Sequence, residues 1–333
     1  MKFSIDGMAR QLKVVGAGLV FAATALTAMA QDFPTRPVEM TVLFPAGSSA
    51  DLVARALAEA MGRQLGQQVV VVNRPGAGGA IGYRHVAGQR PNGYSIVFNS
   101  NSISTAYHSG TMPFGYTAFD AVARVTLELP VLAVQAAAPW RNLNEMVTHG
   151  RQRPGAIRVG NSGIGSHTHM SAVAFFEEAN VQVTHVPFAG AQVVPNLLGG
   201  HFEAVVSLPG ALAAHVRGGS LRVLGTLAAT REPVFRDVPT SVEQGFRFTA
   251  ELWRGIAVPR GTPQPVITRL EDAIRGAVAS PEFKAQGELL GFVPAFQPAS
   301  EFSRTISAED VLIRGVMQRL GLATTQQPPG RPQ

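Results

Sequence analysis

The sequence predicts an α/β protein of two hinged lobes with a cleft between them, and three observations support this fold class. The chain has 333 residues and is 46% hydrophobic, enough for about two domains with proper cores. Strand-like and helix-like segments alternate along it, a pattern typical of largely parallel sheets. Two segments pass between the two units: an apolar crossing strand followed by a turn at 128–140, and an irregular, proline-rich return at 230–246. We therefore expect each lobe to hold a mainly parallel sheet flanked by helices.

The N-terminal segment predicts export from the cytoplasm. Lys2, Arg10 and Lys13 form a basic leader before the apolar run "VVGAGLVFAATALTA", and Ala28-Met29-Ala30 is a small-residue cleavage site. We interpret 1–30 as a signal peptide that is cut after Ala30, leaving a soluble periplasmic or secreted protein. A membrane anchor is the alternative, but the run is shorter than the roughly 20 apolar residues that span a bilayer.

The composition excludes several function classes. The chain has no cysteine, and hence no acylation site, disulfide framework or thiolate metal site. Without the leader it carries 25 basic and 21 acidic residues, and Lys284 is its only lysine. This small positive excess does not predict nucleic-acid binding. It is compatible with a mild attraction for small anions.

The first lobe is predicted from 31–130 together with 249–322. Strands are expected at 38–44, 68–72 and 94–99, with helices at 51–66 and about 79–89; Ser48 or Ser49 can cap the first helix and Gly66 can end it. The chain should return through a buried strand within 253–263 and helices at 263–280 and 307–321. Residues 323–333 are expected to form a disordered tail.

The second lobe is predicted from 131–248. Helices are expected at 143–152, 167–179 and 192–200, and strands at 156–161, 183–188, 202–207 and 221–228.

The stretch "VVVVNRPGAGGAIG" (69–82) does not fit a dinucleotide site. The expected third glycine falls on Ile81, Arg74 and Pro75 separate the strand from the glycines, and no acid occurs between Glu59 and Asp120 to bind a ribose. That acid-free segment cannot by itself hold a carboxylate metal site, but it is suited to receive an anion.

The cluster "GNSGIGSHTHM" (160–170) invites enzyme and metal interpretations. It fails as a nucleophile elbow because Ile164 stands where the last glycine should be. His167 and His169 in the first turn of a helix lie about 200° apart and share a metal poorly. Capping or ordinary hydrogen bonding is the simpler interpretation, and His185 and His201 are expected to be structural.

Two small-residue loops repeat one arrangement that suits anion binding. "PAGSSAD" and "SGIGSHTH" each join a strand to a helix, so their backbone N–H groups lie at a helix N-terminus. Each could be only a tight turn. Two such loops facing one cleft favour a binding site.

At these residues the sequence resembles the substrate-binding proteins of tripartite tricarboxylate transporters, the Bug or TctC-type periplasmic receptors. The similarity covers nearly all of the mature chain, from "FPTRPVEMTVLFPAGSSADLVARALAEAMG" through "VGNSGIGSHTHM", "HVPFAG", "LLGG" and "RDVPTSVEQGF" to "ELWRGIAVPRGTP". The resemblance implies a two-lobed, type II-like periplasmic binding-protein fold that closes on a small carboxylate, amino acid or related anion. It also implies delivery of that ligand to membrane transporter subunits, with no catalytic residue, metal, cofactor or nucleic acid, and a monomeric state.

The resemblance also implies the ligand-binding residues. They comprise the first-lobe loop, the facing loop of the second lobe and the walls, namely Phe44, Pro45, Ala46, Gly47, Ser48, Ser49, Ser100, Asn101, Ser102, Ser162, Gly163, Ile164, Gly165, Ser166, His169, Phe188, Ala189, Gly190 and the start of the segment 207–210, Ser207.

Departures from the family pattern predict a ligand less polar or less charged than citrate. Ala50 replaces a common threonine, and in the usual "HVPYKG" the tyrosine is Phe188 and the cation is Ala189. An aromatic or short-chain monocarboxylate would suit this cleft. Two other functions stay open at this point: a sensor that presents its ligand to a membrane regulator, and a serine hydrolase using Ser162 with a histidine.

Overall fold

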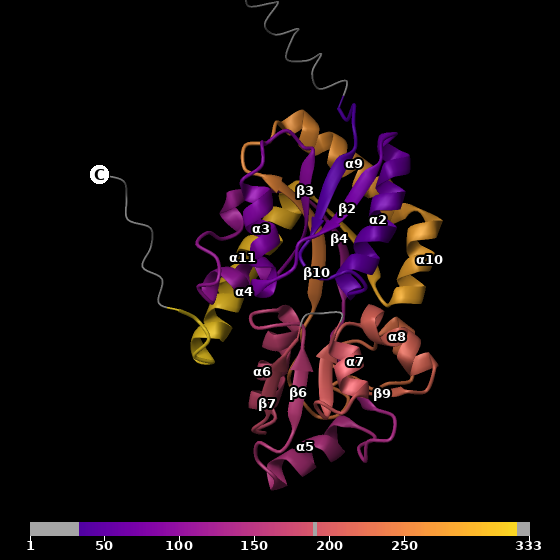
Figure 1. Ribbon diagram of the computed structural model, residues 1–333, viewed down its shortest axis with the longest axis vertical. Coiled ribbons are helices and arrows are strands. Elements are labelled where there is room, and N and C mark those ends of the chain that lie inside the picture. The colour runs from indigo at the N-terminus through magenta and orange to yellow at the C-terminus, as the bar shows by residue number, and fades with distance from the viewer. Residues whose placement is uncertain (1–32, 189–191, 325–333) are drawn as a thin grey trace, which may run out of the picture.

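The computed structural model describes residues 33–188 and 192–324, which form two lobes stacked along the long axis of the molecule (Figure 1). The predicted signal peptide, 1–30, lies outside these ranges, as do residues 325–333. Ala323 and Thr324, which we expected in the disordered tail, donate hydrogen bonds to the carbonyls of Met317 and His108. Among the helices of the described ranges, none has the length and apolar character needed to cross a membrane.

The first lobe is built on a six-stranded sheet with the order β11-β4-β10-β3-β1-β2. Apolar side chains of α2, α9 and α10 cover one face of the sheet, and those of α3, α4 and α11 cover the other. The elements are β1 (Val38–Val42), α2 (Ser49–Leu65), β2 (Val69–Asn73), η1 (Ala77–Gly79), α3 (Ala80–Ala87), β3 (Ser95–Ser100), α4 (Ser102–His108), η2 (Tyr116–Ala118), β4 (Phe119–Glu128), β10 (Leu252–Pro259), α9 (Gln264–Ala279), α10 (Pro281–Leu290), β11 (Val293–Pro298) and α11 (Ala299–Arg319).

The second lobe is built on a five-stranded sheet with the order β7-β6-β8-β5-β9. One core cluster contains residues of α5 and α6, and another contains residues of α7 and α8. The elements are β5 (Val131–Gln135), α5 (Leu143–Gln152), β6 (Arg158–Asn161), α6 (His167–Glu178), β7 (Thr184–Pro187), α7 (Val193–Leu198), β8 (Ala204–Ser207), α8 (Pro209–Arg217), β9 (Leu221–Thr226) and η4 (Pro233–Phe235).

Both sheets are mixed, which corrects the prediction of mainly parallel sheets. β1 pairs in parallel with β2 and β3, and β6 pairs in parallel with β7 and β8. The strands beside the crossings run the other way: β10 is antiparallel to β3 and β4, and β5 is antiparallel to β8 and β9. The direction of a strand that enters a sheet from the other lobe is set by the crossing. No strand–helix–strand unit joins such a strand to its neighbours and makes it parallel to them.

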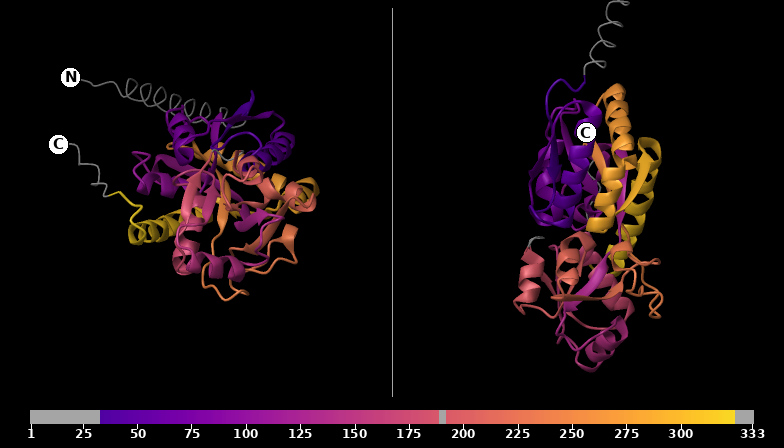
Figure 2. Two further views of the ribbon diagram at one scale, coloured as in Figure 1. Left: turned by 60° about the horizontal axis from the view of Figure 1, so that its bottom comes forward. Right: turned by 90° about the vertical axis from the view of Figure 1, so that its right-hand side faces the viewer.

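The C-terminal elements complete the first lobe. Helix α9 packs on α2, about two hundred positions earlier in the chain, and β10 lies between β3 and β4. Figure 2 shows this return from the side, with the orange and yellow helices beside the indigo N-terminal elements. The described chain therefore passes from the first lobe to the second and back, which places a cleft at the crossings.

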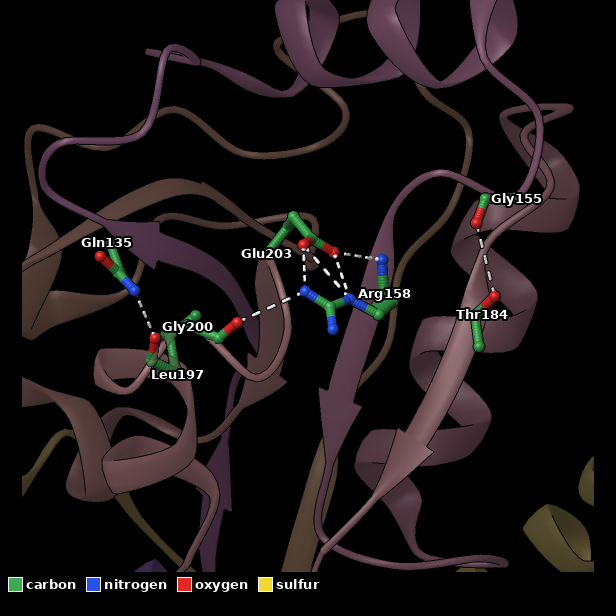
Figure 3. Close-up of polar contacts among 7 residues, drawn as sticks. All are labelled: Gln135, Gly155, Arg158, Thr184, Leu197, Gly200 and Glu203. Carbon is green, nitrogen blue, oxygen red and sulfur yellow. Dashed lines mark hydrogen bonds and ion pairs between the residues drawn. The ribbon is translucent and has the colours of Figure 1, made fainter.

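An ion pair ties the second lobe together far from that cleft (Figure 3). Arg158, the first residue of β6, reaches Glu203 with its Nη2 2.5 Å from Oε1 and its Nε 3.1 Å from Oε2. The Arg158 backbone N–H also donates to Glu203 Oε2, at 2.7 Å. This pair lies at the opposite end of β6 from Asn161, which leads into the predicted ligand loop.

Candidate functional site

A small cavity of about 30 Å³ lies where the two lobes meet, and both predicted loops contribute to it. The helices α2 and α6 begin there, one from each lobe. Of the residues predicted from the sequence, those that line this cavity are Phe44, Ser48, Ser49, Ser102, Ser162, Ser166 and Ser207. We call it the inner cavity.

The first-lobe loop is held by the cap of α2. Ser48 has extended backbone angles and its Oγ accepts from the Asp51 N–H, as the sequence predicted for one of the two serines. Asp51 is buried and accepts from the Gly47 N–H and from Asn73 Nδ2, which also donates to the Phe44 carbonyl. Burial opposes ionisation of Asp51, but Arg55, Gly47 and Asn73 together hold its pKa below the ordinary value. These hydrogen bonds hold the loop in place, and none of them uses a backbone group of Ser49.

The second-lobe loop has a matching arrangement. Ser166 caps α6 by accepting from the His169 N–H at 3.2 Å, and Thr168 Oγ1 accepts from the Ser162 N–H at 3.0 Å. Gly163 and Gly165 adopt φ angles of 111° and 75°, which side chains disfavour. Two helix N-termini thus face one cavity, an arrangement that stabilises a bound anion.

A larger pocket of about 450 Å³ adjoins the inner cavity and shares Phe44 and Ser162 with it. We call it the outer pocket. Four further predicted residues line it: Pro45, Gly163, Ile164 and Phe188. The predicted residues that line neither space are Ala46, Gly47, Ser100, Asn101, Gly165 and His169. Ala189 and Gly190 lie outside the described residues.

His169 lines neither space and makes structural contacts. His167 instead lines the inner cavity, the position that we expected for His169. His169 Nδ1 accepts from the Gly165 N–H at 3.3 Å, and its ring packs 5.4 Å from that of His185. The hydrogen-bonding interpretation of this histidine is confirmed. His167 lines the inner cavity, where burial and, to a smaller extent, the charge of Arg254 lower its pKa to about 4, against the opposing effect of the Glu251 backbone.

Arg254, which lines the inner cavity, forms a buried ion pair with Glu128 that the sequence did not reveal. Arg254 Nε donates to Glu128 Oε1 at 2.5 Å, and Ser49 Oγ donates to Glu128 Oε2. The side chains are 2% and 0% exposed. The available signal was a charged residue inside the otherwise apolar strand "LWRGIAVP", where burial requires a partner.

Glu232 adds no negative charge beside this pair at neutral pH. Its carboxyl is fully buried, and Oε2 has no hydrogen-bond partner in the described structure. Burial raises its pKa to about 8; the Val234 N–H opposes this shift and the charge of Glu128 adds to it. The acid is thus held neutral, so Glu128 is the negative group that faces Arg254.

The glycine-rich stretch contacts the other lobe. Gly78 has φ +64°, and a Cβ placed on it would lie 2.9 Å from the Ile164 carbonyl oxygen. Only glycine allows the two backbones to approach this closely. The stretch therefore forms part of the contact between the lobes at the edge of the outer pocket.

Neither a cluster of metal ligands nor a histidine partner for Ser162 occurs in the described residues. No group of three metal-ligating side chains occurs in 33–188 and 192–324. Within the same ranges Ser162 makes no hydrogen bond with a histidine in either direction; its N–H donates to Thr168 Oγ1. These side chains can bind and orient an anion.

This fold and cleft define a two-lobed periplasmic binding protein, and the comparisons with known proteins agree. The family model of the tripartite tricarboxylate transporter family receptor, TctC, matches residues 53–322, so the chain belongs to this receptor family. The resemblance stated from the sequence is confirmed.

Individual relatives give the same result. Protein BugT of Bordetella pertussis is 33% identical over 290 residues, which cover 84% of this chain and 89% of BugT. A structure described as R. palustris Rpa4515 with adipate has a TM-score of 0.84 at 26% identity, covering 88% of this chain and 99% of that one. MatC from Rhodopseudomonas palustris with bound malate has a TM-score of 0.77 at 26% identity, covering 86% and 98%.

Proposed function

We propose that this protein is an extracytoplasmic receptor that binds a small organic carboxylate between its lobes and delivers it to the membrane subunits of a tripartite transporter. The observation that carries the proposal is the inner cavity, where two helix N-termini and the buried Arg254 converge. Related receptors of known structure hold adipate and malate, which are carboxylates. Hydrogen bonds to a charged ligand contribute about 1.5–3 kcal/mol each, so four or five near the upper figure offset the several kcal/mol cost of immobilising a ligand and still reach the ~8 kcal/mol of micromolar binding.

The finer assignments are part of this proposal. The protein acts in the periplasm as a non-catalytic monomer after cleavage behind Ala30. Its lobes comprise 31–130 with 249–322, and 131–248. The strands support this division, because those of one sheet fall within 38–128 and 252–298 and those of the other within 131–226.

Thermal unfolding of the mature chain against a panel of organic acids, amino acids and sugars tests the proposal. The protein is first unfolded and refolded to remove any ligand carried through purification. A carboxylate present at about 100 times its Kd should add about 2.7 kcal/mol of stability. Stabilisation by sugars alone, or by no compound of a broad panel, would contradict a carboxylate receptor.

A further inference from the structure

We propose that the inner cavity takes the single carboxylate of a monocarboxylic acid on Arg254, and that the outer pocket takes the hydrocarbon tail of the same acid. The inference rests on the proposed receptor function and names its ligand class. Four observations carry it.

Arg254 has hydrogen-bond donors to spare. Its Nε is used by Glu128, while in the described part of the chain neither terminal nitrogen has a hydrogen-bond partner. The guanidinium carbon lies 5.7 Å from the centre of the Phe98 ring, which cannot accept in the guanidinium plane. A planar fork of N–H groups in a buried wall matches the two oxygens of a carboxylate.

Ser102 supplies a second unused donor. It is fully buried at the start of α4, it lines the inner cavity, and its Oγ has no hydrogen-bond partner within the described ranges. A buried hydroxyl without a partner is costly. An oxygen of a bound carboxylate would satisfy it.

The size of the inner cavity limits it to one carboxylate. A water molecule needs about 10–15 Å³ of cavity volume. The inner cavity, with a volume of about 30 Å³, therefore holds about two oxygen-sized atoms. These are the two oxygens of a single carboxylate group. The rest of the ligand must lie elsewhere.

The outer pocket provides room for a hydrocarbon and no counter-ion for a second charge. It continues from the inner cavity past Phe44 and Ser162, and none of its lining residues is charged. Its apolar lining includes Ile164, which is 66% exposed, together with Phe188 and Pro187. A second carboxylate placed there would lose hydration without gaining a partner, whereas an alkyl or aromatic tail would gain from burial.

Calorimetry with three ligands of equal chain length tests the ligand class. We expect hexanoate to bind about tenfold tighter than adipate, and hexanamide, which has no charge, to show no measurable binding. Adipate binding as tightly as hexanoate would overturn the assignment of the outer pocket. If the wild-type protein bound no carboxylate of any kind, the receptor function itself would fail.

Variants test Arg254 separately. The E128Q/R254Q double variant removes both charges together, and we expect it to bind hexanoate about a hundredfold more weakly. The matched E203Q/R158Q double variant removes the exposed pair of the second lobe and should change the Kd less than twofold. Arg254→Lys keeps the ion pair with Glu128 but loses the fork, and we expect about a tenfold loss.

The outcomes separate the possibilities. If Arg254→Lys and E128Q/R254Q melt cooperatively and bind hexanoate like the wild type, Arg254 does not hold the carboxylate. If Ile164→Asp weakens hexanoate but not acetate, the tail lies in the outer pocket; equal losses for both acids would overturn that placement.

Discussion

Two arginine–glutamate pairs of this molecule have the same chemistry and different surroundings. Arg158 and Glu203, in the second lobe, are 44% and 31% exposed and contact each other through several donors (Figure 3). Arg254 and Glu128, between the lobes, are 2% and 0% exposed and share one guanidinium hydrogen bond. In the exposed pair both carboxylate oxygens of Glu203 accept from the Arg158 guanidinium, while the buried pair leaves both terminal nitrogens of Arg254 for a ligand. We infer that the unused donors of a buried arginine distinguish the ligand-binding pair, Arg254 and Glu128, from the structural pair, Arg158 and Glu203.

Removing one partner of each pair should show the largest difference in stability. Arg254→Gln leaves the Glu128 carboxylate in a water-excluded wall without its counter-ion, which should cost about 3–5 kcal/mol of unfolding free energy. The E128Q/R254Q double variant should recover most of this loss. Urea unfolding at neutral pH measures both. If Arg254→Gln were as stable as the double variant, Glu128 would not depend on Arg254.

Lowering the pH should weaken the buried region and leave the exposed pair intact. The pKa of His167 is lowered by burial and by Arg254 to about 4, below the roughly 6.5 of an unfolded chain. At this group the unfolded state therefore binds more protons, and the contribution of His167 to stability falls as the pH drops from about 6.5 towards 4. Burial opposes the ionisation of Glu203, but its bonds with Arg158 lower its pKa, so its contribution to stability is present above a pH of about 4.5 and is lost only as the pH falls further.

A pH series of urea unfolding tests this difference. His167→Gln should remove at most about 1.4 kcal/mol per pH unit of the slope. The slope that remains includes His169, whose pKa burial and His185 lower to about 4, and His185 itself, which act in the same direction as His167. Glu232, whose pKa burial raises to about 8, acts in the opposite direction below that pH. His201→Gln, at an exposed position, should leave the slope unchanged. If the unfolding free energy of the His167→Gln variant varied with pH as in the wild type, His167 would not be held neutral in the folded protein.

Closure of the cleft should depend on Gly78. Gly78→Ala places a Cβ 2.9 Å from the Ile164 carbonyl oxygen, so hexanoate affinity should fall about tenfold. Gly155→Ala is the control, because its φ of +77° gives the same backbone strain with no atom within 4 Å of the new Cβ. Equal affinities for the two variants would show that the contact between Gly78 and Ile164 does not contribute to ligand binding.

The smallest effect is expected in the exposed pair. Arg158→Gln loses an interaction that solvent already screens, so the melting temperature and the hexanoate affinity should both stay close to the wild type. Differential scanning fluorimetry with and without hexanoate measures both quantities. A large loss of affinity in Arg158→Gln would break the distinction between the two pairs.

The sequence predicted the features that depend on local pattern. The apolar spacing within 51–66 and the serine before it located α2 and its cap, which the structure has at Ser49–Leu65 and Ser48. Helix α4 was missed because "SISTAYH" has no apolar period, and strand direction at the crossings was wrong because it depends on the other lobe. Arg254 was missed for a similar reason, since its partner Glu128 lies 126 positions earlier in the chain.

A crystal structure of the mature protein with ω-bromohexanoate tests the central claim most directly, because the bromine marks the tail. We predict the carboxylate oxygens within hydrogen-bond distance of the Arg254 terminal nitrogens and Ser102 Oγ, and the bromine beside Ile164 and Phe188. A bromine in the inner cavity, or a carboxylate held only at the outer pocket, would contradict the assignment of Arg254 as the group that binds the ligand's charge.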